Sequence, residues 1–232
     1  MNQIPQEFDQ FAQQYRPDLD KALSLSGESS AYFAQLKVKK LAQWIPLLSN
    51  QEATILDFGC GDGLMTSFLK QQFSRAAVFG VDPSPKSIEI AQKNYTDVSF
   101  SVNSDTTTTL DFPDGMFDVV CAAGAFHHIP FSMHEGYMNE INRILKKNGT
   151  FVLFELNPLN PVTVMIFRRN PIDKNACMLW PWYARSLNSK YGKVRTKFYS
   201  FFPHALKYLR FTEPFMTKVP FGALYAVIMN KK

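Results

Sequence analysis

The segment Ile55–Gly63, ILDFGCGDG, places three glycines at alternate positions directly after a short apolar run that ends in an acid. Fixing a glycine costs backbone entropy, so Gly59, Gly61 and Gly63 indicate a sharply bent backbone that another group approaches closely. The residues before this loop predict a buried strand, and those after it predict a helix. The segment therefore predicts a ligand site in a strand–loop–helix unit, and a nucleoside is the expected ligand.

Strand and helix patterns alternate along the chain up to Leu156. Short apolar runs predict strands, and segments with apolar residues at helical spacing predict the helices between them. The predicted strands read ATILDF, AVFGVD, VSFSV, FDVVCAAGAF and TFVLFEL, and the predicted helices read LMTSFLKQQF, SPKSIEIAQKNY and MHEGYMNEINRILKK, the last closed by Gly149. This alternation predicts parallel strands with crossover helices on both faces of one sheet.

The N-terminal region has apolar residues at helical spacing from Glu7 to Leu25, interrupted by Pro17. This pattern predicts two short helices or one kinked helix, because proline removes a helical hydrogen bond. A further helix is predicted for residues 30–44.

The alternation breaks after Leu156. Residues 157–180 contain several Asn-Pro pairs and further prolines, which are typical of turns, and they predict a loop or lid. Beyond it the sequence predicts a helix near Trp182–Tyr191, a strand at VRTKFYSFF, a short helix after Pro203 and a last strand at LYAVIMN.

The composition, with 46% hydrophobic and 19% charged residues in 232, is that of a globular protein with a substantial core. Its three cysteines, Cys60, Cys121 and Cys177, are far apart and form no CxxC pair, so we expect reduced thiols, no disulfide framework and no metal site. The N-terminus lacks the basic and apolar regions of a secretory signal, and about 18 uncharged apolar residues never run together. A cytoplasmic protein without a membrane span is expected.

Charge is distributed unevenly. Residues 1–160 hold 12 basic and 18 acidic residues, whereas residues 161–232 hold 13 basic and two acidic ones. The basic part is either a solvated face or a surface for an anionic acceptor, a phosphorylated lipid carrier, a membrane or nucleic acid. No RNA-binding motif or Arg-rich tract is present, so no specific nucleic acid is expected.

The residues around the loop limit which nucleoside ligands are expected. The second predicted strand ends in Asp82, about 20 residues beyond the glycines, where an acid is suited to accept hydrogen bonds from ribose hydroxyls. A dinucleotide fingerprint that begins at Gly59 would require Gly or Ala at position 64, where this chain has Leu64. No Gly-Lys-Ser/Thr is present, so a P-loop is excluded as well.

The pattern of Asp57 followed by Gly59, Gly61 and Gly63 resembles motif I of the class I S-adenosylmethionine-dependent methyltransferases. GVDPSP, LDFPDGMFDVV and EINRILKKNGTFVLFE are similar to later motifs of this family, although Lys-Asn-Gly stands where Leu-Lys-Pro-Gly-Gly is usual. FDQFAQQY is similar to its cofactor-covering N-terminal helix. The resemblance covers residues 8–156. It implies a Rossmann-like, doubly wound sheet of seven strands, mostly parallel with an antiparallel last strand and helices on both faces.

The resemblance also implies a set of cofactor contacts. The glycine loop would admit the methionine portion, Asp57 would hold its ammonium group directly or through water, Asp82 the ribose and Asp105 the adenine. A helix cap or Asx turn explains Asp105 equally well. The cofactor-binding residues are predicted to be Tyr15, which would shield the sulfonium, Asp57, Gly59, Cys60, Gly61, Gly63, Asp82 and Asp105.

Three residues at strand ends are candidates for catalysis: His127 and His128 after the fourth strand, and Glu155 at the tip of the fifth. Either histidine acts as a general base or only orients groups, and the sequence does not separate the two. Glu155 is either a base or a carboxylate satisfied by loop amides.

The acceptor pocket is expected after the fifth strand. The predicted substrate contacts are Asn157, Arg168 and Arg169, where the arginines either bind a phosphate or lie on the surface. Phe201, Phe202, Phe215 and Phe221 either line a lid over an apolar acceptor or fill the core.

These features predict a methyltransferase that converts S-adenosylmethionine to S-adenosylhomocysteine and methylates a small or lipid-linked acceptor, with oxygen as the expected methyl acceptor. Residues 1–48 would cap the cofactor site, residues 49–156 bind the cofactor, and residues 157–232 form the acceptor lid and the last strands. Peripheral membrane contact through the basic C-terminal region is expected. The alternatives are a non-catalytic S-adenosylmethionine-binding regulatory protein and, disfavoured by Leu64, an NAD-dependent oxidoreductase. The acceptor and the oligomeric state stay open.

Overall fold

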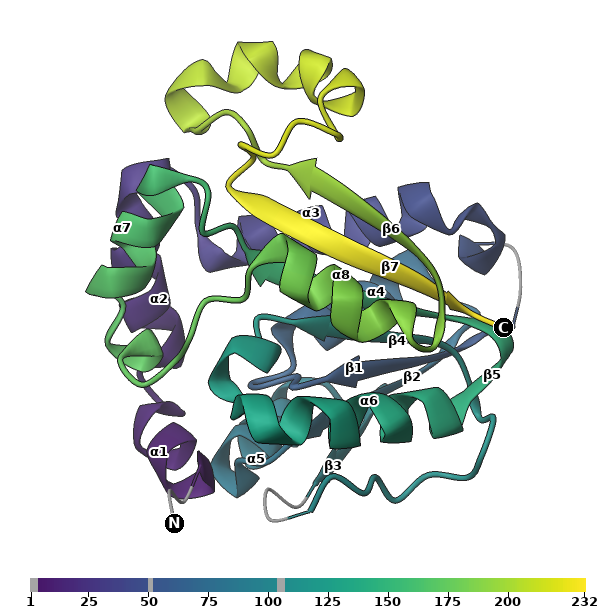
Figure 1. The fold of residues 1–232 in the computed structure, drawn as a ribbon. Coiled ribbons are helices and arrows are strands. Elements are labelled where there is room, and N and C mark those ends of the chain that lie inside the picture. Colours follow the sequence, from purple (N-terminus) through teal and green to yellow (C-terminus); the bar gives the residue numbers. More distant parts are fainter. Residues whose placement is uncertain (1–3, 50–51, 104–106) are drawn as a thin grey trace.

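The computed structural model of the chain describes residues 4–49, 52–103 and 107–232. Its centre is a seven-stranded sheet with the strand order β3-β2-β1-β4-β5-β7-β6 (Figure 1). The strands are β1 (Thr54–Phe58), β2 (Ala77–Asp82), β3 (Ser99–Val102), β4 (Phe117–Ala123), β5 (Leu145–Leu156), β6 (Gly192–Tyr199) and β7 (Leu224–Lys231).

Strands β1 to β5 pair in parallel, and β7 pairs antiparallel with both β5 and β6. The strand order reverses between β1 and β4, which is the place where open α/β sheets bind ligands at the carboxyl ends of their strands. The predicted fold class, a mostly parallel seven-stranded sheet with an antiparallel last strand, is confirmed.

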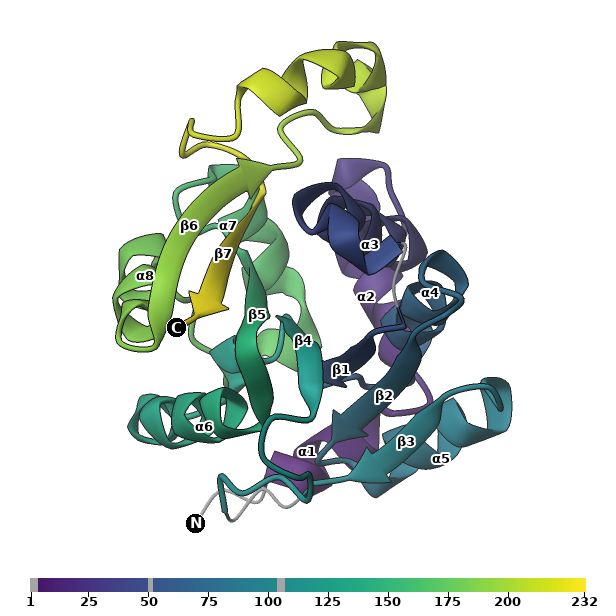
Figure 2. The ribbon, with the colours of Figure 1, turned by 90° about the vertical axis from the view of Figure 1, so that its right-hand side faces the viewer.

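Helices cover both faces of the sheet, with α3, α4 and α5 on one face and α6 and α8 on the other (Figure 2). The bounds are α3 (Ser30–Trp44), α4 (Leu64–Gln72), α5 (Pro85–Asn94), α6 (Phe131–Ile144) and α8 (Pro181–Ser189). Each face has its own apolar core. Met138 and Ile141 of α6 pack on one face, and Val38, Leu41 and Leu69 pack on the other.

Two helices precede this unit, as predicted: α1 (Ile4–Phe11) and α2 (Tyr15–Leu23). The break lies at residues 12–14 rather than at Pro17, which corrects the prediction. Pro17 stands in the first turn of α2, where the missing N–H would have no helical partner. α1 packs against α5, and α2 packs against α3 and α7 (Pro161–Arg169).

The segment after β5 differs from the prediction. It was expected to be a loop or lid, but it contains the helix α7 (Pro161–Arg169), which lies beside α2 (Figure 1). Asn160 caps α7, because its side-chain oxygen accepts a hydrogen bond from the Thr163 N–H, and Pro161 suits the first helical position. Pro161, which was interpreted as part of a loop, therefore begins a helix.

The end of α6 differs from the prediction, and the helix after Pro203 agrees with it. The helix expected to reach Gly149 ends at Ile144, and β5 begins at once with Leu145. The short helix expected after Pro203 is present as a 3₁₀ segment, η5 (His204–Phe215). Every helix in the described ranges falls short of the length and hydropathy that a bilayer crossing demands.

Candidate functional site

The glycine loop between β1 and α4 has left-handed backbone at all three glycines, with φ of +76° at Gly59, +54° at Gly61 and +82° at Gly63. A Cβ on Gly59 would lie 2.5 Å from Ala125 Cβ, and one on Gly63 would lie 2.8 Å from the Phe100 ring. A Cβ on Gly61 would meet no atom within 4 Å. Packing therefore demands two of the glycines, while Gly61 leaves an open space beside its main chain.

Asp82, at the end of β2, holds the loop in place. Its Oδ2 accepts a hydrogen bond of 2.9 Å from the Gly61 N–H, and its Oδ1 accepts one of 2.9 Å from the Ser84 N–H. Burial raises the pKa of Asp82 from 3.8 to about 6, although both N–H groups favour the ionised form. A carboxylate has about four lone-pair sites, so two main-chain donors leave room for further donors from a ligand.

Asp57, in β1, is a second buried carboxylate at the loop. Its Oδ2 accepts a hydrogen bond of 2.8 Å from Thr66 Oγ1 of α4. Burial raises its pKa to about 6, while the hydrogen bond from Thr66 and the positive charge of Lys37 oppose this shift. Two acids from neighbouring strands, both beside the glycine loop, give the site a negative field that favours a cationic ligand.

Two cavities meet at the loop and share Tyr15, Gly59, Gly61 and Ala123. The smaller, of about 90 Å³, is bordered by polar residues from the ends of β2 and β3 and by the turn after β4. The larger, of about 320 Å³, extends between α2, α3 and α7. The shared residues place the two cavities next to each other at Gly61.

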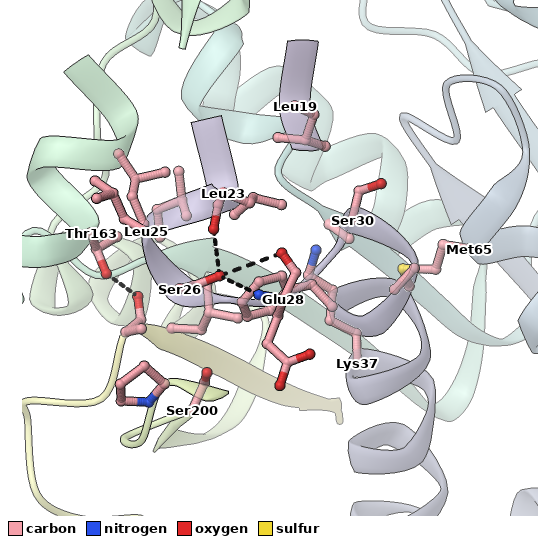
Figure 3. A pocket seen from close by; sticks show the side chains of 18 of the residues that line it. Leu19, Leu23, Leu25, Ser26, Glu28, Ser30, Lys37, Met65, Thr163 and Ser200 are labelled. Atoms are coloured by element: carbon pink, nitrogen blue, oxygen red, sulfur yellow. Dashed lines mark hydrogen bonds between the residues drawn. The ribbon is translucent and has the colours of Figure 1, made fainter. Parts of the chain in front are cut away.

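The larger cavity has a mainly apolar wall with several polar groups. Figure 3 shows Leu19, Leu23 and Met65 on this wall, together with polar residues such as Ser30 and Lys37. The apolar lining also includes Phe33 of α3, Val162 and Ile166 of α7, and Phe201 and Phe202 after β6. Lys37 of α3 lies on the wall near Asp57, and burial lowers its pKa to about 8. The cavity thus suits an apolar molecule, with a cation close to the glycine loop.

The start of α2 covers the loop. Tyr15 borders both cavities, and burial raises its pKa to about 12. Arg16 forms a bidentate ion pair with Asp62 of the loop, including a bond of 2.6 Å from Nε to Oδ2. This pair fixes the N-terminal helices to the glycine loop, which supports the predicted covering role of Tyr15.

The turn after β4 carries His127, which is buried. Its Nδ1 lies 2.7 Å from Glu155 Oε2 of β5, and its Nε2 lies 3.5 Å from Asp173 Oδ1. Burial alone would lower the pKa of His127, but the carboxylates of Glu155 and Asp173 raise it to about 10. Both ring nitrogens therefore face acids of the protein, and His127 does not point at the cavities.

His128 differs from its neighbour because it borders the smaller cavity. Its Nε2 lies 3.4 Å from the same oxygen, Asp173 Oδ1, and Phe8 of α1 packs edge-on against its ring. Burial and the charge of His127 hold the pKa of His128 well below its usual range. The structure thus separates two histidines that the sequence left equivalent.

Asp173 was missed by the sequence analysis. It lies in a short 3₁₀ turn, Pro171–Asp173, that directly follows α7. The sequence carries no spacing that links this aspartate to histidines 45 residues earlier, and only the packing of the segment after β5 brings them together.

Comparison with known proteins identifies the central part of the chain. The sequence pattern of the family described as "Methyltransferase domain" matches residues 56–153. This match shows that the central part of the chain is similar to that family. The match includes Asp57, the glycine loop and Asp82, and it ends inside β5.

Curated relatives agree with this assignment. Demethylmenaquinone methyltransferase of Thermotoga maritima is 34% identical over 106 residues, which are 46% of this chain and 44% of the relative. Fatty-acid O-methyltransferase of Mycolicibacterium smegmatis is 26% identical over 142 residues, or 61% and 50% of the two chains. The chain spans about half the length of the relatives it matches.

A solved structure extends the likeness to the whole fold. The S-adenosylmethionine-dependent methyltransferase of Thermotoga maritima whose structure was determined at 2.20 Å superposes with a TM-score of 0.70, at 18% identity, over 99% of this chain and all of the other. The fold is that of the class I S-adenosylmethionine-dependent methyltransferases. The family and the fold imply S-adenosylmethionine as the cofactor.

The residues of this methyltransferase domain fit that cofactor. The open space at Gly61 admits a ligand against the main chain, Asp82 keeps lone pairs for the ribose hydroxyls, and Asp57 and Asp82 together favour a sulfonium and an ammonium group. Cys60, buried and unpaired, lines the larger cavity beside Gly61. The predicted cofactor residues Tyr15, Asp57, Gly59, Cys60, Gly61 and Asp82 thus border one site, whereas Gly63 packs behind it.

Several predicted acceptor residues lie elsewhere. Asn157 is fully buried, and its amide donates to the carbonyl oxygens of Pro220 and Gly222, so it joins two loops instead of facing the cavity. Arg168 and Arg169, at the end of α7, border shallow surface depressions. Asp105 lies outside the described residues.

The predicted phenylalanines divide into two pairs. Phe201 and Phe202 line the larger cavity, as the lid interpretation expected. Phe215 and Phe221 are 88% and 63% exposed and line neither cavity. They also do not fill the core, which was the other interpretation.

Proposed function

We propose that the protein is an S-adenosylmethionine-dependent methyltransferase that methylates a small, lipid-like acceptor, with oxygen as the methyl acceptor. The observation that carries this proposal is the pair of neighbouring cavities around Gly61, with the carboxylate of Asp82 in the smaller cavity and a mainly apolar wall in the larger one. Two adjacent cavities can hold a cofactor and an acceptor side by side.

The cofactor would lie across the glycine loop. Its ribose hydroxyls would donate hydrogen bonds to the carboxylate of Asp82 in the smaller cavity, and its methionine portion would pass Gly59 and Gly61 toward Asp57. When bound, it supplies an electrophilic methyl group. Tyr15, held above the loop by the Arg16–Asp62 pair, would exclude water from the transfer point.

The acceptor would occupy the larger cavity. Its wall is mostly apolar, and Lys37 supplies a cation near the loop for an anionic or enolic end group. The relatives named for demethylmenaquinone and for fatty acids support a lipid-like acceptor, and the second supports transfer to oxygen. His128 borders the smaller cavity and would contact the cofactor there, while His127 and Glu155 would hold the turn that carries His128.

Peripheral contact with a membrane would give access to such an acceptor. The segment η5 exposes Tyr208, Phe211 and Phe215, and Lys207 and Lys218 lie in or beside it. Exposed aromatic residues with basic neighbours suit an anionic bilayer surface. We expect the double variant Phe211→Ser, Phe215→Ser to lose sedimentation with vesicles that contain anionic lipid, without a change in melting temperature. Unchanged sedimentation would contradict this contact.

The remaining parts of the proposal concern the chain as a whole. Residues 1–48 cap the cofactor site, residues 49–156 bind the cofactor, and residues 157–232 supply the acceptor wall and the last strands. Free thiols at all three cysteines support a reducing, cytoplasmic location. No specific nucleic acid is part of the proposal.

Calorimetry tests the cofactor site. We expect Asp82→Ala to weaken binding of S-adenosylhomocysteine by at least about 100-fold, because hydrogen bonds to a charged group contribute about 1.5–3 kcal/mol each. Asp118→Asn is the matched control, since Asp118 also accepts a main-chain N–H, from Thr54 at 2.8 Å, but stands at the amino end of β4. Wild-type affinity in Asp82→Ala would refute the site.

Incubation with radiolabelled S-adenosylmethionine and a lipid extract tests the transfer. Label in an extractable lipid product, absent with Asp82→Ala, would establish the enzyme. Cofactor binding without any labelled product in lipid, small-molecule or protein fractions would favour a non-catalytic binding protein.

A further inference from the structure

We propose that His127, His128 and Asp173 form a binding site for a divalent transition-metal ion, with His127 Nε2, His128 Nε2 and Asp173 Oδ1 as its ligands. These three atoms lie within 4.8 Å of one another. The side chains are only 5%, 15% and 7% exposed, so the cluster is not a chance group of surface residues. The proposal concerns metal binding itself and does not depend on methyl transfer.

The distances within the cluster favour an ion over direct hydrogen bonds. Asp173 Oδ1 lies 3.5 Å from His127 Nε2 and 3.4 Å from His128 Nε2, whereas the hydrogen bond from His127 Nδ1 to Glu155 is 2.7 Å long. Ligand atoms that surround a tetrahedral ion at about 2.0–2.1 Å stand roughly 3.3–3.4 Å apart. The aspartate thus lies at ligand-to-ligand distance from both imidazoles, and beyond a normal charged hydrogen bond.

The atoms that face away from the proposed ion are held by other groups. His127 Nδ1 bonds to Glu155 Oε2, and Asp173 Oδ2 accepts a hydrogen bond of 2.8 Å from Asn170 Nδ2. A carboxylate behind a histidine ligand fixes the ring and raises its basicity, which is the usual outer arrangement of protein metal sites. The Cys177 N–H also donates to the His127 carbonyl oxygen at 2.8 Å and ties the two segments together.

The alternative is a charged His127 between Glu155 and Asp173 without an ion. That arrangement explains His127 and Glu155, and a neutral His128 would then donate from Nε2 to the same aspartate oxygen, but at 3.4 Å, which is longer than a normal hydrogen bond to a carboxylate. An ion would replace the proton on His127 Nε2 and engage all three side chains at once.

The ligand set selects the class of ion. Two imidazoles and one carboxylate suit Zn²⁺, Co²⁺, Mn²⁺ or Fe²⁺, whereas Mg²⁺ and Ca²⁺ prefer oxygen ligands alone. His128 borders the smaller cavity, so the remaining coordination positions would open toward it. No metal site was expected from the sequence, because its cysteines form no CxxC pair. The ligands proposed here are two histidines and an aspartate that only the fold brings together.

Metal titration of the full chain tests the proposal. After treatment with a chelator, we expect the wild-type protein to bind Zn²⁺ at one ion per chain in calorimetry, and Co²⁺ to give the strong visible absorption of four- or five-coordination. His128→Ala and Asp173→Ala should each weaken Zn²⁺ binding by at least about 100-fold, and Glu155→Gln by about 10–100-fold.

Matched controls separate metal binding from folding. His204→Gln changes an exposed histidine that also pairs with a carboxylate, Glu28, and should bind Zn²⁺ like the wild type. Zn²⁺ should raise the melting temperature of the wild type and of His204→Gln, but not that of folded His128→Ala. Failure of the wild type to bind either ion at stoichiometric concentrations, or equal affinity in the wild type and both ligand variants, would overturn the proposal.

Discussion

The smaller and the larger cavity share four residues but are built in different ways. In the smaller one the carboxylate of Asp82 is held by two main-chain N–H groups at the ends of adjacent parallel strands, and the left-handed Gly59 and Gly61 border both cavities. The larger one is formed by side chains from helices and loops distant in the sequence, including Leu19, Ile166 and Phe201. Binding set by the main chain tolerates sequence change elsewhere, whereas a side-chain wall changes with each substitution.

The largest effect is expected from a substitution that fills the open space at the glycine loop shared by the two cavities. Gly61→Val would place a branched side chain at φ +54° in the open space, so we expect binding of S-adenosylmethionine to weaken beyond detection in calorimetry. Gly115→Val is the control, because Gly115 has a similar φ of +61° and free space around its Cβ position but borders neither cavity.

Both glycine variants should lose a similar amount of stability, roughly 1–2 kcal/mol from the left-handed backbone. Equal cofactor affinity in the two would show that the ligand does not approach Gly61.

A smaller effect follows from the raised pKa values of Asp57 and Asp82, both about 6. Below this pH the carboxylates take up protons and lose their attraction for the sulfonium and ribose hydroxyls. We expect affinity for S-adenosylmethionine to fall between pH 6 and pH 5 by up to about tenfold per pH unit for each of the two carboxylates. Calorimetric titrations from pH 5 to pH 8 measure this change in affinity.

The stability of the free protein should change in the opposite sense. Both acids bind protons more tightly in the folded than in the unfolded chain, so these two groups raise the free energy of unfolding as the pH falls from 6 toward 4. Affinity that stays constant from pH 7 to pH 5 would contradict a role for these carboxylates.

A substitution in the wall of the larger cavity should change acceptor binding without changing cofactor binding. Ile166→Trp fills part of the larger cavity, and we expect several-fold weaker binding of a fluorescent fatty-acid probe, with unchanged affinity for S-adenosylhomocysteine. Met165→Trp is the control on the same helix, because Met165 borders an outer depression instead. A probe that binds all three proteins equally would place the acceptor elsewhere.

The smallest effect concerns Lys37. Burial lowers its pKa to about 8, so the folded protein holds this cation at a cost in stability. We expect Lys37→Met to raise the melting temperature by a few degrees, and exposed Lys39→Met on the same helix to leave it unchanged. A lower melting temperature for Lys37→Met would show that the ammonium group stabilises the fold.

The same contrast explains what the sequence predicted. Glycine spacing and strand alternation are local properties, so the sheet, the loop and the place of Asp82 were predicted correctly. The position of Asp173 depends on how α7 packs against α2, and the partners of Asn157 depend on a loop 63 residues later. Such contacts leave no periodic pattern, and the proline-rich start of α7 was therefore read as a loop.

The proposed function requires an adenosyl ligand that lies across Gly61 and reaches both cavities. This ligand position can be seen in a crystal structure of the protein soaked with S-adenosylhomocysteine. We expect density with the ribose hydroxyls within hydrogen-bond distance of Asp82 and the amino-acid end beside Asp57. Density at any other place, or none at saturating concentration, would contradict it.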